Sequence, residues 1–217
     1  MTPAGRARKI LALLKKTHPD AHCALNHRNP LQLLVATILS AQCTDVRVNK
    51  VTPGLFKKYR SAADYAKADL KQLEQEVRTT GFYRQKSRSI QRAARELVSR
   101  FKGKVPRTLE ELVTLPGVWR KTANVILGNC YGVPGIVVDT HVKRLAYRMG
   151  LTNRTDPDKI ELDLMKMLPK KDWTFFSHAM IFHGRRICAA VRPACPSCPV
   201  NPLCPKRGVT SVRQSGV

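Results

Sequence analysis

Four of the seven cysteines in this 217-residue chain lie within seventeen residues and constrain how its last part can fold. They form a C-x6-C-x2-C-x5-C array made of Cys188, Cys195, Cys198 and Cys204. Prolines stand between and beside them, which favours loops over a regular helix. An odd cysteine total with four clustered thiols argues for a metal site and against the disulfide framework of a secreted protein.

The ligand of this array is restricted by its spacing. Four thiolates suit either a structural zinc ion or a [4Fe-4S] cluster. Zinc sites usually draw their ligands from two C-x2-C pairs, whereas this array has one such pair and two outlying cysteines. The spacing therefore favours an iron-sulfur cluster over zinc, with paired disulfides as a third alternative.

The charge of the chain predicts a polyanionic partner. Lysine and arginine number 39 against 15 acidic residues, which gives a formal net charge of +24. Nucleic acid is the default partner of such a chain, although ribosomal and membrane-surface proteins can be equally basic. Between Arg78 and Arg107 a single acidic residue, Glu96, stands among ten basic ones. Four arginines there recur at helical spacing opposite an apolar face, as expected of a helix that follows phosphates: Arg84, Arg88, Arg92 and Arg95.

Helical periodicity dominates the rest of the sequence. Apolar positions predict helices over residues 31–39, 46–55, 109–113, 123–127 and 142–149, and the basic N-terminal stretch favours a plain helix over a transit peptide. No segment alternates as a strand would, and the longest apolar stretch is shorter than the roughly 20 residues that cross a bilayer. Three further cysteines are expected to be buried thiols: Cys23, Cys43 and Cys130.

The segment from Thr108 to Asn124 predicts a helical hairpin. Thr108 with Glu111 three residues later is typical of a capping box, and a Pro116-Gly117 turn separates the short helix that follows from a second one near Arg120. The amides and the positive dipole end of that second helix can bind a phosphate. Lys121 lies in its first turn. Further along, Asp139 is expected at the N-cap of another helix.

Four motifs together resemble the endonuclease III family of helix-hairpin-helix DNA glycosylases. They are ILSAQCTD, LPGVWRKTANVIL, IVVDTH and the cysteine array, and they cover nearly the whole chain. The resemblance implies an all-α, two-domain helix-hairpin-helix glycosylase fold with a DNA cleft between the domains. A six-helix barrel that contains the hairpin would span residues 23–133, and an iron-sulfur cluster domain would combine residues 1–22 and 134–217.

The resemblance also implies roles for individual residues. Lys121 is similar to the family's nucleophile, Asp139 to its catalytic carboxylate, and the four cysteines to the ligands of its [4Fe-4S] cluster. Gln42 resembles the side chain that fills the gap left by an extruded nucleotide, and Phe82 occupies the wedge position of the opposite strand. Ser40 and Asp45 match pocket positions, while the remaining expected DNA contacts are Arg84, Arg88, Pro116, Gly117, Val118, Trp119, Arg120, His141 and Arg192.

The implied activity is that of a bifunctional DNA glycosylase and AP lyase in base excision repair. Such an enzyme extrudes a damaged nucleotide, and Lys121 would then form a Schiff base with the sugar, so that oxidised pyrimidines are released and the strand is cleaved 3′ to the abasic site by β-elimination. The expected partner is double-stranded DNA with damaged bases or abasic sites. The chain is expected to be a monomer without membrane contact, in the cytoplasm or nucleoid of a prokaryote, or in the nucleus or mitochondrion of a eukaryote.

One departure from the family pattern leaves alternatives open. The family's hairpin reads LPGVG, whereas this chain has Trp119 at the second glycine position. A bulky indole there can limit the approach of a phosphate or stack on DNA. The alternatives are a glycosylase-like damage-binding protein with weak or no catalysis and a zinc-stabilised nucleic-acid-binding protein. An adenine-specific glycosylase is disfavoured because Lys121 occupies the nucleophile position and no further domain follows Cys204.

Overall fold

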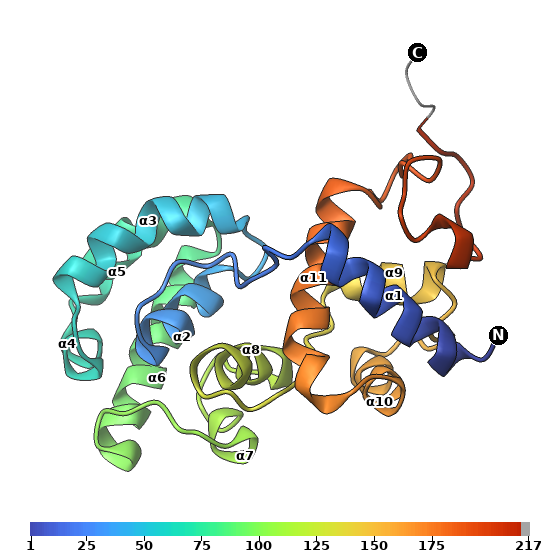
Figure 1. Cartoon of the computed structure of the whole chain (residues 1–217). Helices are drawn as coiled ribbons and strands as arrows, with labels where there is room; N and C mark the ends of the chain where they lie inside the picture. The colour runs from blue at the N-terminus through green and yellow to red at the C-terminus, as the bar shows by residue number, and fades with distance from the viewer. Residues whose placement is uncertain (214–217) are drawn as a thin grey trace. The chain divides into compact units, whose positions relative to one another are not determined.

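The computed structural model describes residues 1–213, and these residues form helices without a strand, which confirms the predicted all-α fold class (Figure 1). The chain divides into two compact units. One is the continuous segment Cys23–Val133, and the other joins Met1–His22 to the chain from Pro134 onward.

The unit Cys23–Val133 is organised around its longest helix, α6, which packs against α2, α4 and α5. Leucines from several helices, among them Leu33, Leu73 and Leu97, are fully buried in its core. The elements of this unit are α2 (Pro30–Leu39), α3 (Asp45–Lys58), α4 (Ala62–Lys67), α5 (Leu70–Val77), η1 (Arg78–Thr80), α6 (Tyr83–Phe101), α7 (Leu109–Leu112) and α8 (Arg120–Cys130).

Local signals explain where these helices begin. The Asn29 side chain accepts a hydrogen bond from the amide of Gln32, and Pro30 occupies the first position of α2, where its missing N–H costs nothing. Thr108 likewise accepts from the amide of Glu111 at the start of α7, as predicted. The second half of the predicted capping box is wrong, because the Glu111 carboxylate accepts from the Thr108 hydroxyl at 2.9 Å.

The amphipathic helix expected in the basic segment is α6, Tyr83–Phe101. Its four spaced arginines are exposed, whereas Ile90, Ala94 and Leu97 are buried against the core. The charged side chains of α6 therefore face solvent and its apolar stripe faces the core, as the helical periodicity predicts.

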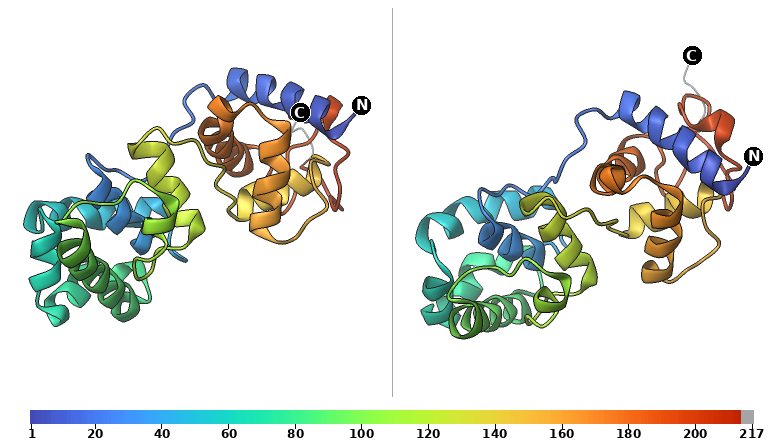
Figure 2. Two further views of the ribbon diagram at one scale, coloured as in Figure 1. Left: turned by 90° about the horizontal axis from the view of Figure 1, so that it is seen from below. Right: turned by 60° about the horizontal axis from the view of Figure 1, so that its bottom comes forward.

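The second unit consists of α1 (Pro3–Thr17), α9 (Thr140–Arg148), α10 (Pro157–Met167), η2 (Lys170–Asp172), α11 (Trp173–Arg186) and η3 (Asn201–Leu203). Although α1 begins the chain, it packs against α10 and α11, as both views of Figure 2 show. The core between them includes Ile10, Leu14, Leu164 and Phe176, all fully buried.

Two sequence expectations need correction. Cys23, Cys43 and Cys130 are half-buried, not fully buried as predicted, because each lies at the edge of the core. Periodicity also left out α4 and α5, which are too short to show it, and the longer α10 and α11. Within residues 1–213, no helix is long and apolar enough to span a membrane.

Candidate functional site

The hairpin consists of α7, the turn at Pro116-Gly117 and α8, and α8 begins at Arg120 as predicted. Its turn depends on Gly117, whose φ of +80° lies in the region that side chains disfavour. A Cβ at Gly117 would also approach the Ser89 Cβ on α6 to 3.0 Å. Trp119 is the N-cap residue of α8, but its indole has no acceptor with which to cap the first amides.

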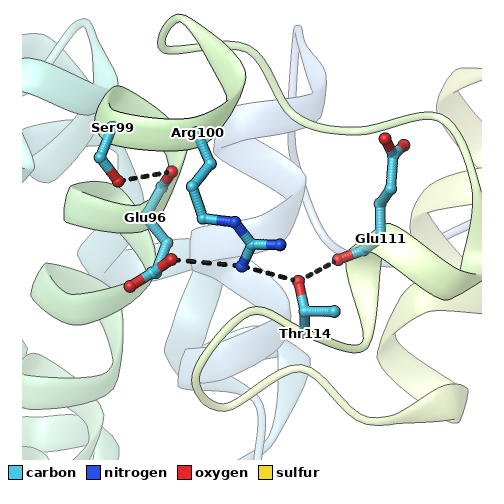
Figure 3. Close-up of polar contacts among 5 residues, drawn as sticks. All are labelled: Glu96, Ser99, Arg100, Glu111 and Thr114. Carbon is cyan, nitrogen blue, oxygen red and sulfur yellow. Dashed lines mark hydrogen bonds and ion pairs between the residues drawn. The ribbon is translucent and has the colours of Figure 1, made fainter.

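A polar chain anchors the hairpin to the last turns of α6 (Figure 3). Arg100 donates to the Glu96 carboxylate at 3.3 Å and to the Thr114 hydroxyl at 3.2 Å. Thr114 in turn donates to the carbonyl of Glu111 at 2.7 Å, at the end of α7. The side chains of Glu96 and Arg100 are partly exposed, so these contacts orient the hairpin more than they stabilise the fold.

Beside the hairpin, the same unit contains a pocket of about 320 Å³. This volume is in the range of small-molecule sites and can admit a nucleobase. Lys121 is exposed in the first turn of α8 and lines the pocket. The structure gathers several other predicted residues at the same pocket, namely Ser40, Gln42, Phe82, Gly117 and Trp119.

Two of these residues have backbone conformations that residues other than glycine rarely adopt. Gln42, three residues past the end of α2, has a φ of 51°, and Phe82, directly before α6, has a φ of 47°. Left-handed conformations of bulky residues cost about 1–3 kcal/mol and persist where the surroundings impose them. The Phe82 side chain is 61% exposed and the Trp119 side chain 78%, so two large aromatic groups face solvent at one pocket.

Sequence reasoning missed Lys86, which lines the same pocket. It is 4% exposed, and its ammonium donates hydrogen bonds to the carbonyls of Leu39 and Thr80. Burial lowers the pKa of Lys86 from its ordinary value. The signal was available, because Lys86 falls four residues before Ile90 on the apolar stripe of α6, where a lysine requires internal partners.

The other residues predicted in this unit lie around the pocket or away from it. Asp45, in the first turn of α3, is not among the pocket residues, whereas Arg84 and Arg88 are exposed on α6. Val118 is 3% exposed, and its amide donates to the carbonyl of Leu115 at 3.0 Å. Pro116 and Arg120 are half-buried beside it.

Asp139 and His141 belong to the other unit, at the start of α9. Asp139 is the N-cap residue, as predicted, and its carboxylate accepts a 2.8 Å hydrogen bond from the amide of Val142. The His141 Nδ1 lies 3.1 Å from the guanidinium of Arg144. Gly184 of α11 allows this contact, because a Cβ there would come within 2.7 Å of the His141 ring.

The four cysteines of the array line one small cavity of about 20 Å³. α9 holds their loop, since Arg148 donates to the carbonyls of Ala189 and Ala190 and approaches the Cys188 sulfur to 3.5 Å. The buried His183 of α11 lies 3.3 Å from the Cys198 sulfur through Nε2. Arg192, the expected phosphate contact of this loop, is exposed with a φ of 50°.

The environment of these thiols suits a bound cation. Burial raises the pKa of Cys198 to about 11 and also raises that of Cys204, so that their thiolates need a nearby positive charge. Among residues 1–213, no three His, Cys, Asp or Glu side chains meet closely enough to hold a single metal ion. A mononuclear zinc site would bring every sulfur to about 2.3 Å from one ion.

Comparison with known proteins identifies close relatives. Residues 35–170, well over half of the chain, match the family described as HhH-GPD superfamily base excision DNA repair protein. The chain is 55% identical over 201 residues to endonuclease III of Synechocystis sp., a match that covers 92% of each protein.

Two solved structures share the fold and much of the sequence. One is a non-covalent endonuclease III-DNA complex, with a TM-score of 0.91 and 49% identity over 95% of this chain and 97% of that one. The other is a trapped endonuclease III-DNA covalent intermediate, with the same TM-score, identity and coverage.

Proposed function

The chain belongs to the endonuclease III family of HhH-GPD base excision DNA repair proteins, and from this premise we propose that it excises oxidised pyrimidines through Lys121. Its activity is that of a DNA glycosylase and AP lyase, and its partner is DNA. The substrate range and the roles of single residues are proposed here. The observation that carries it is the exposed Lys121 at the pocket with Gln42 and Phe82.

The proposed recognition step uses the strained residues of the pocket. Extruding a base from a duplex costs a few kcal/mol, and the cost is least for a damaged base that stacks poorly. Gln42 would occupy the space that the base leaves, and the exposed Phe82 ring would wedge into the opposite strand. The exposed arginines of α6 would contact phosphates without reading the sequence.

The proposed chemistry begins with the neutral amine of Lys121. Its nitrogen attacks C1′ of the sugar, the glycosidic bond breaks, and the base leaves with a proton. The bound amine then expels the ring oxygen O4′, which takes up a proton, and the opened sugar is an imine. The imine acidifies the C2′ protons, so that loss of one of them expels the 3′ phosphate. Water then releases the lysine. The relative solved as a trapped covalent intermediate with DNA supports a covalent route.

Asp139 is proposed as the carboxylate that takes up a proton or stabilises positive charge on the sugar. Its place at the start of α9 supports this role, because the hydrogen bond from the Val142 amide holds the carboxylate at the N-cap. One carboxylate oxygen of Asp139 accepts the capping hydrogen bond and fixes the side chain. The second oxygen is therefore not needed for capping.

Membership of this family fits a metal cofactor in general, and we propose a [4Fe-4S] cluster held by Cys188, Cys195, Cys198 and Cys204. Four thiols around one cavity support it, and the single C-x2-C pair with two outlying cysteines favours an iron-sulfur cluster over a single zinc ion. The unit that contains these cysteines would be the cluster domain, and residues 23–133 the barrel domain. Residues 214–217 of the expected cluster domain lie outside the described residues.

Product analysis tests the proposed function. The protein is incubated with a duplex that carries one thymine glycol and with a matched duplex that carries thymine. We expect base release and a nick with a 3′ unsaturated aldehyde from the first duplex only. Base release with an intact strand would contradict the lyase step, and the absence of release would contradict the proposed substrate class.

Metal analysis tests the proposed cofactor separately. Protein expressed with iron available should be yellow-brown and contain about four iron atoms per chain, as a cubane with four thiolates requires. Colourless protein with stoichiometric zinc would contradict the cluster and favour the zinc-stabilised alternative.

A further inference from the structure

Lys86 joins the two chain segments that lead into Gln42 and Phe82. Its ammonium donates to the Leu39 carbonyl at 2.8 Å and to the Thr80 carbonyl at 2.7 Å. Leu39 precedes Gln42 by three residues, and Thr80 precedes Phe82 by two. One buried side chain therefore holds both segments from the first turns of α6.

The first of these segments ends a helix. Leu39 is the last residue of α2, where carbonyls lack partners within the helix and carry the negative end of the dipole. The chain then turns, because the Cys43 amide donates to the Ser40 carbonyl at 3.1 Å and leaves Gln42 in its left-handed conformation. A positive charge against the Leu39 carbonyl stabilises the end of α2 from which this turn departs.

The second segment starts a helix without the usual side-chain cap. Phe82 is the N-cap residue of α6, and its side chain offers no hydrogen bond to the helix amides. Thr80 ends η1, and Gly81 and Phe82 then both have positive φ values, 71° and 47°. Two hydrogen bonds from Lys86 hold this turn. Its ammonium donates to the Thr80 carbonyl, and its amide donates to the Phe82 carbonyl at 3.0 Å.

We propose that Lys86 is a positioning residue that holds Gln42 and Phe82 in the geometry needed to enter DNA. The inference rests on the proposed function, in which these two side chains replace and wedge beside the extruded nucleotide. A buried lysine, here 4% exposed, is costly unless its ammonium is hydrogen-bonded, and each of its two carbonyl partners lies two or three residues before a strained residue at the pocket.

The alternative is that Lys86 contributes only to the stability of the core. A purely structural lysine would alter unfolding without altering how the folded protein distorts DNA. The test therefore needs a readout of distortion that does not depend on the reaction of Lys121.

The experiment compares wild-type protein with Lys86→Met, which keeps most of the length of the side chain and removes its donors. A duplex with a non-cleavable abasic analogue carries 2-aminopurine opposite the lesion, so that unstacking raises fluorescence. We expect wild type to raise the signal and Lys86→Met to lose most of that rise. Single-turnover release of thymine glycol should fall roughly 10- to 100-fold, the effect of a misplacement of about 1 Å, while affinity for undamaged duplex stays within about twofold.

A double-mutant cycle tests whether Lys86 acts through Phe82. If it does, Lys86→Met should cause much less loss in a Phe82→Ala background than in wild type, because the wedge that it positions is already gone. Lys71→Met is the matched control, since Lys71 is an exposed lysine of α5 outside the pocket. If Lys86→Met does not fold, Lys86→Gln, which keeps an NH₂ donor group on a shorter side chain, should show the same selective loss to a smaller degree.

The outcomes separate the two proposals. Wild-type fluorescence and base release in the folded Lys86 variants would overturn the positioning role and leave the proposed function intact. Equal losses in the wild-type and Phe82→Ala backgrounds would also overturn it. Wild-type protein that neither unstacks the duplex nor releases the base would overturn the proposed function, and the role of Lys86 with it.

Discussion

The Asp139 carboxylate accepts a 2.8 Å hydrogen bond from the Val142 amide, so the same side chain caps α9 and carries the proposed catalytic charge. These two roles can be separated because asparagine caps helices about as well as aspartate. Asp139→Asn removes the charge and keeps the cap, whereas Asp139→Ala removes both.

For Asp139→Asn we expect a fall of about 10² to 10⁴ in single-turnover base release, the range of a positioned acid or base. Its unfolding free energy should stay close to that of wild type, while Asp139→Ala should lose about 0.5–2 kcal/mol through the missing cap. Denaturant unfolding and single-turnover kinetics on the same preparations measure both quantities. Full activity in Asp139→Asn would remove the carboxylate from the chemistry.

The exposed arginines of α6 predict strong salt dependence of DNA binding. If about six to ten phosphates are contacted, affinity for undamaged duplex should fall roughly 10³- to 10⁵-fold between about 50 and 200 mM salt. Replacing Arg88 and Arg92 with alanine should weaken binding to all sequences alike and reduce the salt slope by about 2. Titrations at several salt concentrations measure the slope, and an unchanged slope in the variant would place the phosphates elsewhere.

His178 predicts that stability falls in mild acid. Burial, with a smaller contribution from His22, lowers the pKa of His178 to about 4. The folded state keeps this ring neutral while the unfolded chain protonates it below about pH 6.5, so its contribution is complete above that pH and is lost as pH falls toward 4. Between pH 7 and 5 this amounts to roughly 2 kcal/mol.

Thermal or denaturant unfolding at pH 7 and 5 checks this prediction against His178→Phe. The variant removes the titrating ring, so its loss of stability between the two pH values should be smaller than that of wild type. Equal losses in the two proteins would assign the acid sensitivity to other groups.

The exposed ring of Trp119 can either obstruct the substrate or stack on DNA, and one variant distinguishes the two effects. Its 78% exposed indole stands at the start of α8, beside Lys121, where a bound phosphate must approach the amides. We expect Trp119→Gly to keep the hairpin, because Gly117 alone requires a positive φ there. Higher base release in the variant would show that the indole obstructs the substrate, and weaker binding to damaged duplex would show that it stacks on DNA.

Much of the candidate site could be predicted because its signals are local. The cap at Asp139, the Pro116-Gly117 turn and the start of α8 depend on residues within one or two turns of each other. The burial of Lys86 could be predicted from its place on the apolar stripe of α6, but its partners, Leu39 and Thr80, could not, since they come from other elements. The short helices α4 and α5 were not predicted for a different reason, because they have too few turns to establish a helical period.

The central claim is that Lys121 is the nucleophile, and borohydride trapping tests it most directly. Sodium borohydride reduces a Schiff base to a stable amine, so wild-type protein should become covalently linked to a duplex that contains thymine glycol. Lys121→Gln should bind the same duplex and form no adduct. An adduct of wild-type yield in Lys121→Gln would contradict the account and assign the reaction to another amine.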